Sequence, residues 1–177
     1  RLARQTVRTK LNLEMAATKE MLDVTLEVKP DMVTIVPEKR QELTTEGGLD
    51  VKTHAEGLKK FISHIKDAGI RVNLFIDPSP EAVKACHRIG SDGIEIHTGA
   101  YAGTREGQVR AAELKRIYDT AVLSKRLGMR THAGHGLDYY NILPVASIRE
   151  IDEFAIGYSI ISRAVYVGIE EAVREMK

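Results

Sequence analysis

Arg126-Leu-Gly-Met-Arg130 lies where a long helical pattern ends and a short apolar segment begins, and two other stretches repeat this arrangement. They are Asp67-Ala-Gly-Ile-Arg71 and Arg88-Ile-Gly-Ser-Asp-Gly93. In each stretch a glycine follows the helical pattern, as is common at the C-terminal end of a helix. A strand-like segment begins directly afterwards. The recurrence favours a repeating strand–helix architecture.

Six short apolar segments have the length and composition of buried strands. They are Leu11–Met15, Met32–Val36, Arg71–Ile76, Gly93–His97, Arg130–Ala133 and Phe154–Tyr158. Helical patterns lie before and between them. These patterns are Arg1–Lys10, a helix capped by Thr18, His54–Ala68, a helix opened by Ser79 and Pro80, Gln108–Leu127 and Val165–Met176. Strands that alternate with helices predict βαβ units and a parallel sheet.

The fold class that we expect is α/β, a TIM (β/α)8 barrel. Such a barrel typically needs about 250 residues. Six βα units in 177 residues match a barrel whose first two units are absent from this chain, so residues 1–177 would form a single domain, the C-terminal three-quarters of a barrel. A doubly wound open sheet is the alternative. That fold usually carries a glycine-rich loop after its first strand, and the stretch Ala16–Lys19 has no glycine.

Composition and charge narrow the classes of function. The net charge of +1 gives no support for a nucleic-acid partner or an anionic membrane surface. No apolar run approaches the roughly 18 residues that a membrane span needs. The single cysteine, Cys86, lies in a helical pattern and predicts plain packing in a reducing, cytoplasmic compartment. Because the chain does not begin with methionine, we expect further residues upstream.

Polar side chains gather at the ends of the expected strands, where barrel enzymes place their catalytic groups. Glu14 sits within an apolar strand, where an unpaired carboxylate is costly. Glu95 and His97 alternate with isoleucines and so share one face. His135 is flanked by two glycines, which leaves it little packing role. These residues are candidates for proton transfer.

The remaining polar residues near strand ends leave more than one interpretation open. Glu38 and Asp77 precede turns and are equally explained as solvated loop residues. His132 either acts in the site or packs inside the barrel. His54 and two further histidines, His64 and His87, lie on helical patterns and are expected at the surface.

Two loops have the composition of an anion site. The stretch Thr44–Gly48 offers hydroxyls and flexible backbone N–H groups, although an ordinary turn also explains it. The stretch Gly157–Ser159 precedes a helix near the end of the chain, where barrels often bind phosphate. A metal site is not expected. His132 and His135 are three residues apart, but no nearby Cys or Asp completes a zinc set, and help from Glu95 and His97 is conjecture.

Taken together, these motifs resemble the pyridoxine 5′-phosphate synthase family of vitamin B6 biosynthesis. The matching stretches are collinear and span nearly the whole chain: Asn12–Ala16, Val36–Asp50, Leu74–Asp77, Ile94–Gly99, Ala133–Leu137 and Ile161–Val165. The run Val-Pro-Glu-Lys-Arg-Gln-Glu followed by Thr-Thr-Glu-Gly-Gly is long and specific.

The resemblance implies a (β/α)8 barrel enzyme, a transferase that forms the pyridoxine ring. It condenses 3-amino-2-oxopropyl phosphate with 1-deoxy-D-xylulose 5-phosphate to give pyridoxine 5′-phosphate, phosphate and water. By motif position, Glu14 would be a catalytic proton acceptor, His135 the proton donor and Glu95 the residue that stabilises the transition state. No metal or organic cofactor is implied.

The resemblance also implies substrate contacts and an assembly. Thr44 would contact the deoxyxylulose phosphate, and Gly136 with the Gly157–Tyr158 pair would hold the aminooxopropyl phosphate. Members of the family form homo-octamers built from dimers, so a homo-oligomer is expected here.

The family also begins with two more βα units, which carry a further catalytic histidine and contacts to the deoxyxylulose phosphate. Nothing in this chain matches them, so we expect the chain expressed alone to be inactive. Two alternatives stay open: another phosphosugar-binding barrel enzyme, such as an epimerase or aldolase, and a non-catalytic barrel fragment. An aldolase needs a Schiff-base lysine inside a late strand, whereas Lys39 lies in a loop.

Overall fold

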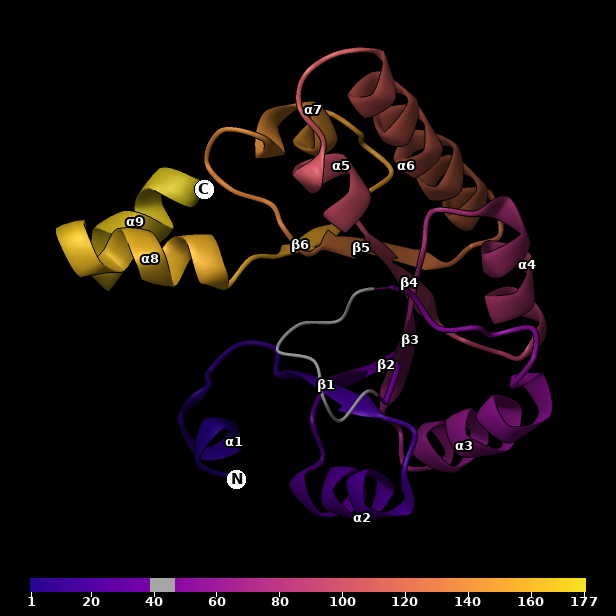
Figure 1. The fold of residues 1–177 in the computed structure, drawn as a ribbon. Helices are drawn as coiled ribbons and strands as arrows, with labels where there is room; N and C mark the ends of the chain where they lie inside the picture. The colour runs from indigo at the N-terminus through magenta and orange to yellow at the C-terminus, as the bar shows by residue number, and fades with distance from the viewer. Residues whose placement is uncertain (39–46) are drawn as a thin grey trace.

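The computed structural model describes residues 1–38 and 47–177, and its strands form one sheet whose order follows the chain. The strands are β1 (Asn12–Ala16), β2 (Met32–Val36), β3 (Arg71–Ile76), β4 (Gly93–His97), β5 (Arg130–Gly134) and β6 (Glu153–Ala155). Each strand pairs in parallel with the next. Figure 1 shows the sheet curling, with β1 and β6 at its two ends.

The helices that join the strands lie on the outer side of the curl, whereas the first helix and the last two lie beyond the ends of the sheet (Figure 1). The helices are α1 (Leu2–Thr6), α2 (Lys19–Val28), α3 (Ala55–Asp67), α4 (Pro80–Arg88), α5 (Gly99–Gly103), α6 (Gln108–Arg126), α7 (Ile142–Ala146), α8 (Tyr158–Val167) and α9 (Ile169–Met176). A doubly wound sheet reverses its strand order and carries helices on both faces. The sequential order and one-sided helices therefore confirm the barrel-type α/β fold.

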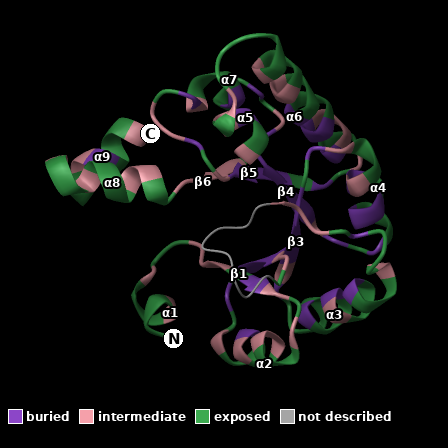
Figure 2. Ribbon diagram, in the orientation of Figure 1, coloured by how far each residue is buried: buried purple, intermediate pink, exposed green. Residues whose placement is uncertain are grey.

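Alternate residues of each strand point to opposite sides of the sheet, and here the two sides differ in character. The side facing the helices forms the hydrophobic core, which Figure 2 shows as buried ribbon along β3 to β5. Strand residues in that core are Met15, Val33, Ile35, Val72, Leu74, Ile76, Ile94, Ile96 and Ala133. The other side points into the curl and is polar, with Glu14 beside Thr34 and Glu95 beside His132 in the strand register.

Strand positions were predicted well, whereas the last part of the chain differs. We expected a strand over Phe154–Tyr158, but β6 ends at Ala155 and helix α8 already begins at Tyr158. The expected helix Val165–Met176 is wrong as well, because Gly168 separates α8 from α9. Gly168 has φ of 83°, a left-handed conformation that glycine adopts without strain. The short helices α5 and α7 were not predicted.

The predicted N-caps are present at two helices. Thr18 Oγ1 accepts a hydrogen bond from the Met21 N–H, and Ser79 Oγ accepts one from the Ala82 N–H with Pro80 at the first helical position. Because each cap satisfies an N–H that the helix itself cannot pair, it fixes where the helix begins.

We expect Ser79→Ala to destabilise the protein by about 1 kcal/mol, since the Ala82 N–H then loses its acceptor. Urea unfolding measures the change. Ser79→Thr keeps the hydroxyl group at this position and is the matched control. Equal losses in the two variants would contradict the capping role.

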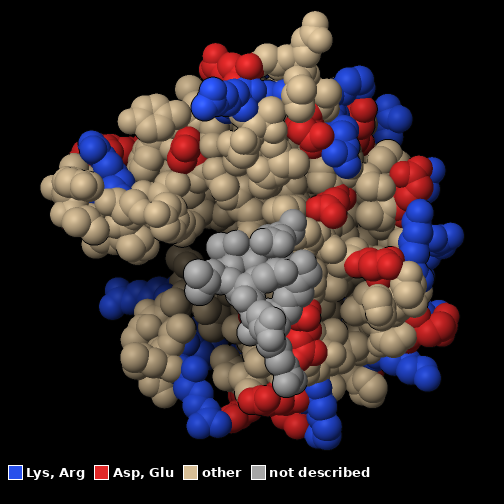
Figure 3. Space-filling view, viewed as in Figure 1, with Lys and Arg blue, Asp and Glu red and all other residues tan. Residues whose placement is uncertain are grey.

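Three histidines and the cysteine lie where the sequence predicted. His54, His64 and His87 are exposed, and Cys86 is buried, which raises the pKa of its thiol to about 12 and leaves it a packing residue. On the face shown in Figure 3, positive and negative side chains are interspersed. Within residues 1–38 and 47–177, no helix has the length and apolar character to cross a membrane.

Candidate active site

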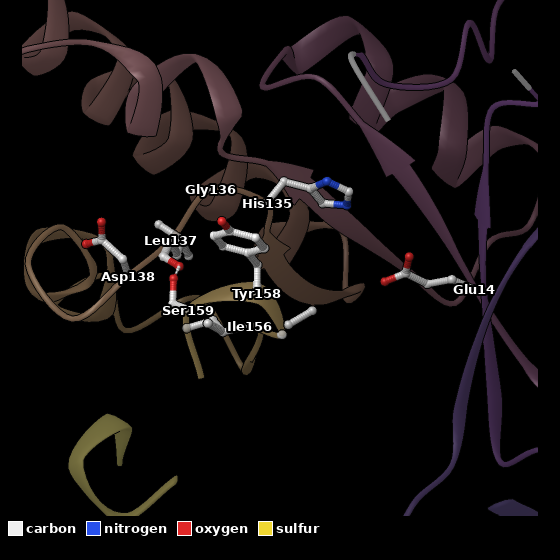
Figure 4. Close-up of a pocket in the computed structure, with 10 residues that line it drawn as sticks. Glu14, His135, Gly136, Leu137, Asp138, Ile156, Tyr158 and Ser159 are labelled. Atoms are coloured by element: carbon white, nitrogen blue, oxygen red, sulfur yellow. Dashed lines mark hydrogen bonds between the residues drawn. The ribbon is translucent and has the colours of Figure 1, made fainter. Parts of the chain in front are cut away.

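A cavity of about 640 Å³ opens at the C-terminal edge of the sheet. It is lined by Glu14 from β1, by residues 135–138 after β5, and by residues 155–159 from the end of β6 to the start of α8. Because the C-terminal ends of parallel strands meet at one edge, segments far apart in the chain converge here. Figure 4 shows Glu14 pointing across the cavity toward His135 and Tyr158.

Three of the predicted site residues lie together. Glu14, Glu95 and His135 each offer one carboxylate oxygen or ring nitrogen, and these atoms lie within 4.8 Å of one another. The three residues come from β1, β4 and the loop that follows β5. Their convergence supports the prediction that they form one site.

Glu95 is the most deeply placed of the three. Its side chain is fully buried, and within the described residues neither carboxylate oxygen has a hydrogen-bond partner. The pKa of Glu95 is raised to about 7, chiefly by burial and to a smaller extent by the nearby charge of Glu14, while the Thr34 side chain acts in the opposite direction. A carboxyl group with this pKa can both hold and release a proton near neutral pH.

Glu14 differs from the sequence expectation in one respect. Its neighbours on β1 are apolar, but the side chain points into the curl and remains exposed rather than buried. Partial desolvation still raises its pKa above the usual range. Glu14 is exposed and Glu95 is buried. In such unequal surroundings, one carboxyl group ionises at a lower pH than the other.

His135 has an unusual backbone. Its φ is 77°, in a region that non-glycine residues seldom adopt. The Thr98 hydroxyl lies 2.6 Å from the Gly134 carbonyl oxygen and 2.7 Å from that of His135. The Thr98 N–H also donates to the Gly134 carbonyl at 2.8 Å. Desolvation, and secondarily the charge of His97, lower the pKa of His135.

The strained backbone of His135 is typical of functional sites, where surrounding contacts enforce such conformations. Gly136 follows with φ of 76°, and a Cβ there would lie 2.7 Å from the Ala102 Cβ. Gly136 lines the cavity, so its backbone can approach a ligand without side-chain obstruction.

The other predicted binding residues are placed as follows. Gly157 and Tyr158 line the cavity at the start of α8, with Gly157 as its N-cap. The Ser159 hydroxyl donates to the Leu137 carbonyl at 2.9 Å and so ties the loop after β5 to this helix. Thr44 lies outside the described residues, and its predicted contact stays a prediction.

His132, whose role the sequence left open, packs inside the curl on β5, beside Glu95 in the strand register. It is buried, and its Nε2 lies 3.9 Å from Glu153 on β6. Desolvation lowers the pKa of His132, and the charge of Lys10 lowers it further. The charge of Glu153 acts in the opposite direction. This environment favours a neutral ring held by packing.

His97 and Asp77 form a pair that the sequence did not predict. His97 Nδ1 lies 3.0 Å from Asp77 Oδ1, and the His97 ring lies edge-on to the His135 ring. The signal was available in part, since His97 shares a face with Glu95. The pairing with Asp77 depended on how β3 and β4 align.

The described residues also bear on metal binding. The cluster of Glu14, Glu95 and His135 is compact enough to hold a cation, although sequence spacing alone had suggested no such set. Carboxylate and imidazole groups serve equally well as ligands and as acid–base groups. Experiment separates the two uses.

Comparisons with known proteins show the family to which the chain belongs. Residues 1–177 match the family described as pyridoxal phosphate biosynthesis protein PdxJ. Pyridoxine 5′-phosphate synthase of Syntrophotalea carbinolica is 59% identical over 176 residues, covering 99% of this chain and 74% of the relative. That of Geobacter sulfurreducens is 56% identical with the same coverage.

Among solved structures, a mutant tryptophan synthase alpha-subunit from the hyperthermophile Pyrococcus furiosus superposes with a TM-score of 0.63 at 16% identity. The alignment covers 98% of this chain and 67% of that one. At this identity the likeness supports the fold alone.

Proposed function

Because this chain belongs to the PdxJ family of pyridoxal phosphate biosynthesis proteins, we propose that it makes pyridoxine 5′-phosphate with Glu14, Glu95 and His135 as its acid–base residues. The enzyme condenses 3-amino-2-oxopropyl phosphate with 1-deoxy-D-xylulose 5-phosphate and releases phosphate and water. The observation that carries the proposed roles is the approach of these three side chains to within 4.8 Å.

The reaction needs several proton transfers in sequence. An amine adds to a ketone, water leaves, an enol forms, phosphate departs and the ring closes. Groups of different pKa around one cavity suit such a sequence. Glu14, the more exposed carboxylate, accepts protons, and His135 donates them to leaving oxygens. Glu95, with a pKa of about 7, stabilises charge that develops between them.

Phosphate binding follows from the backbone of the cavity wall. The N–H groups at Gly136 and at the Gly157–Tyr158 start of α8 would face a phosphate of the aminooxopropyl substrate. A bound phosphate dianion close to His135 favours the protonated imidazole and so raises its pKa, opposite to the effect of desolvation. Substrate binding would thereby prepare the proton donor.

Incubating the full-length enzyme with both phosphorylated substrates tests the activity. We expect pyridoxine 5′-phosphate and inorganic phosphate to appear in equal amounts. Each substrate alone is the control. Conversion of the sugar phosphate alone, without the amine, would instead indicate an epimerase or aldolase.

We also propose that residues 1–177 form a single domain, six units of an eight-unit barrel, and that the enzyme is a cytoplasmic homo-octamer. The continuous sheet from β1 to β6 supports the single domain. Family membership supports the assembly and the compartment.

Light scattering coupled to gel filtration measures the assembly, and a dimeric mass would contradict it. Enzyme recovered with the membrane fraction of lysed cells would contradict the compartment.

We expect removal of metal ions to leave turnover unchanged within about twofold, because acid–base catalysis requires the cluster atoms to be free for protons. Activity is measured before and after treatment with a chelator. Added Zn²⁺ should inhibit, since it would occupy the same carboxylate and imidazole atoms. Loss of activity on chelation, with recovery on adding one divalent ion, would establish a metal centre instead.

A further inference from the structure

His97 is held on two sides at the end of β4. Its Nδ1 lies 3.0 Å from Asp77 Oδ1, which follows β3. On the other side the ring lies against Gly99, where a Cβ would be only 2.5 Å from His97 Nε2. The imidazole is buried, whereas the Asp77 side chain is 56% exposed. Asp77 and Gly99 together therefore fix both the position and the rotation of the His97 ring.

The fixed His97 ring in turn contacts His135. The two ring centroids are 5.4 Å apart at an interplanar angle of 87°, an edge-to-face contact. Phe75, the inward-facing residue of β3 next to Glu95, completes the group, with its ring centroid 5.0 Å from that of His97 and 4.4 Å from that of His135. The catalytic candidate is thus packed against two rings that the neighbouring strands hold in place.

We propose that His97, oriented by Asp77, is a positioning residue that fixes the ring orientation and the protonation of His135. The inference rests on the proposed role of His135 as proton donor. A carboxylate that accepts from Nδ1 selects one tautomer and one ring orientation in a histidine. His97 then presents a fixed ring edge to His135. The Thr98 hydroxyl in turn holds the strained backbone of His135.

Among the described residues, charged and titratable groups from several elements surround His135. Glu14 faces it from β1, Glu95 and His97 from β4, Asp77 stands behind His97 at the end of β3, and Asp138 follows on its own loop. When His97 carries a proton, its charge opposes a second positive charge on His135 and lowers the pKa of His135. Removing His97 should therefore let His135 stay protonated to higher pH.

The test compares His97→Gln with His87→Gln, a matched control on the exposed side of α4. For His97→Gln we expect kcat to fall about 10- to 100-fold with KM changed less than about threefold. The basic limb of the kcat–pH profile should also move to higher pH. A fall in kcat and in thermal stability with an unmoved basic limb would overturn the proposal, as would an unchanged kcat.

The second position to vary is Asp77. It should tolerate substitution because its side chain is largely exposed. Asp77→Ala should lower kcat in the same direction, and Asp77→Asn, which keeps an oxygen acceptor for His97 Nδ1, should retain more of it. Equal activity in both Asp77 variants and the wild type would contradict the orienting role.

Nuclear magnetic resonance of labelled histidines gives a readout independent of turnover. The titration of His135 should move to higher pH in His97→Gln and stay unchanged in His87→Gln. If the enzyme makes no pyridoxine 5′-phosphate, the proposed function fails while this coupling still stands. If the titration of His135 does not move, the inference fails although the proposed function stands.

Discussion

We expect His135→Asn and Glu14→Gln each to lower kcat by about 10²- to 10⁴-fold, the range that positioned acid–base groups contribute. Glu14→Gln keeps nearly the same volume, and His135→Asn keeps a polar side chain, but neither amide can transfer a proton at neutral pH. His135 and Glu14 lie on facing sides of the cavity, within the cluster that also holds Glu95. The rate of pyridoxine 5′-phosphate formation at saturating substrate measures the loss.

Matched controls come from exposed residues of the same types, His64 on α3 and Glu20 on α2. His64→Asn and Glu20→Gln should keep normal turnover. Near-normal turnover in both His135→Asn and Glu14→Gln would remove these two residues from the mechanism.

The double variant distinguishes one step from two. If Glu14 and His135 act at different steps, the two delays add, so the double variant is about as slow as the slower single variant. If both act in the same transition state and independently, the losses multiply. We expect addition, because a proton acceptor and a proton donor serve different stages of the condensation.

Much of this fold was predictable because periodicity and glycine positions are local features of the chain. The strands Met32–Val36, Arg71–Ile76 and Gly93–His97 begin and end where the sequence predicted. The end of the chain was not predicted, because Phe154–Tyr158 is apolar throughout and such a run fits a strand or the start of a helix equally well. The helical pattern also did not separate the two helices that meet at Gly168.

The site was predictable residue by residue, but its geometry was not. Glu14, Glu95 and His135 each carried a local sign, such as a carboxylate in an apolar strand or a histidine between glycines. Their approach required the curl of the sheet, which brings β1 across from the loop after β5. The positive φ of His135 and the Asp77–His97 pair depend on contacts between neighbouring strands, and no local pattern encodes those.

Glu95→Gln should stabilise the folded protein above neutral pH while impairing the reaction. Glu95 has a folded pKa of about 7 against an ordinary value of 4.5, so the folded state binds its proton more tightly than the unfolded state does. That advantage is fully present below pH 4.5 and is lost as pH rises through about 7. The raised pKa corresponds to a loss of about 3 kcal/mol in the wild type, which glutamine does not suffer because it does not titrate.

Urea unfolding at a series of pH values from 4 to 8 measures this difference. The variant and the wild type should differ least near pH 4.5, and the advantage of the variant should grow to about 3 kcal/mol above pH 7. Glu20→Gln, on the exposed side of α2, is the control and should run parallel to the wild type. A constant difference between Glu95→Gln and wild type across this range would show that Glu95 ionises in the fold as freely as in the unfolded chain.

The same measurement on Glu14→Gln tests why the Glu95 pKa is high. Burial is the larger cause and the charge of Glu14 the smaller one. Removing the Glu14 charge should therefore shrink the pH-dependent loss of stability without abolishing it. If the loss disappears in Glu14→Gln, repulsion between the two carboxylates rather than burial would control Glu95. The buried carboxyl would then be tuned chiefly by the residue that faces it across the cavity, and its proton affinity would change whenever Glu14 accepts a proton from substrate.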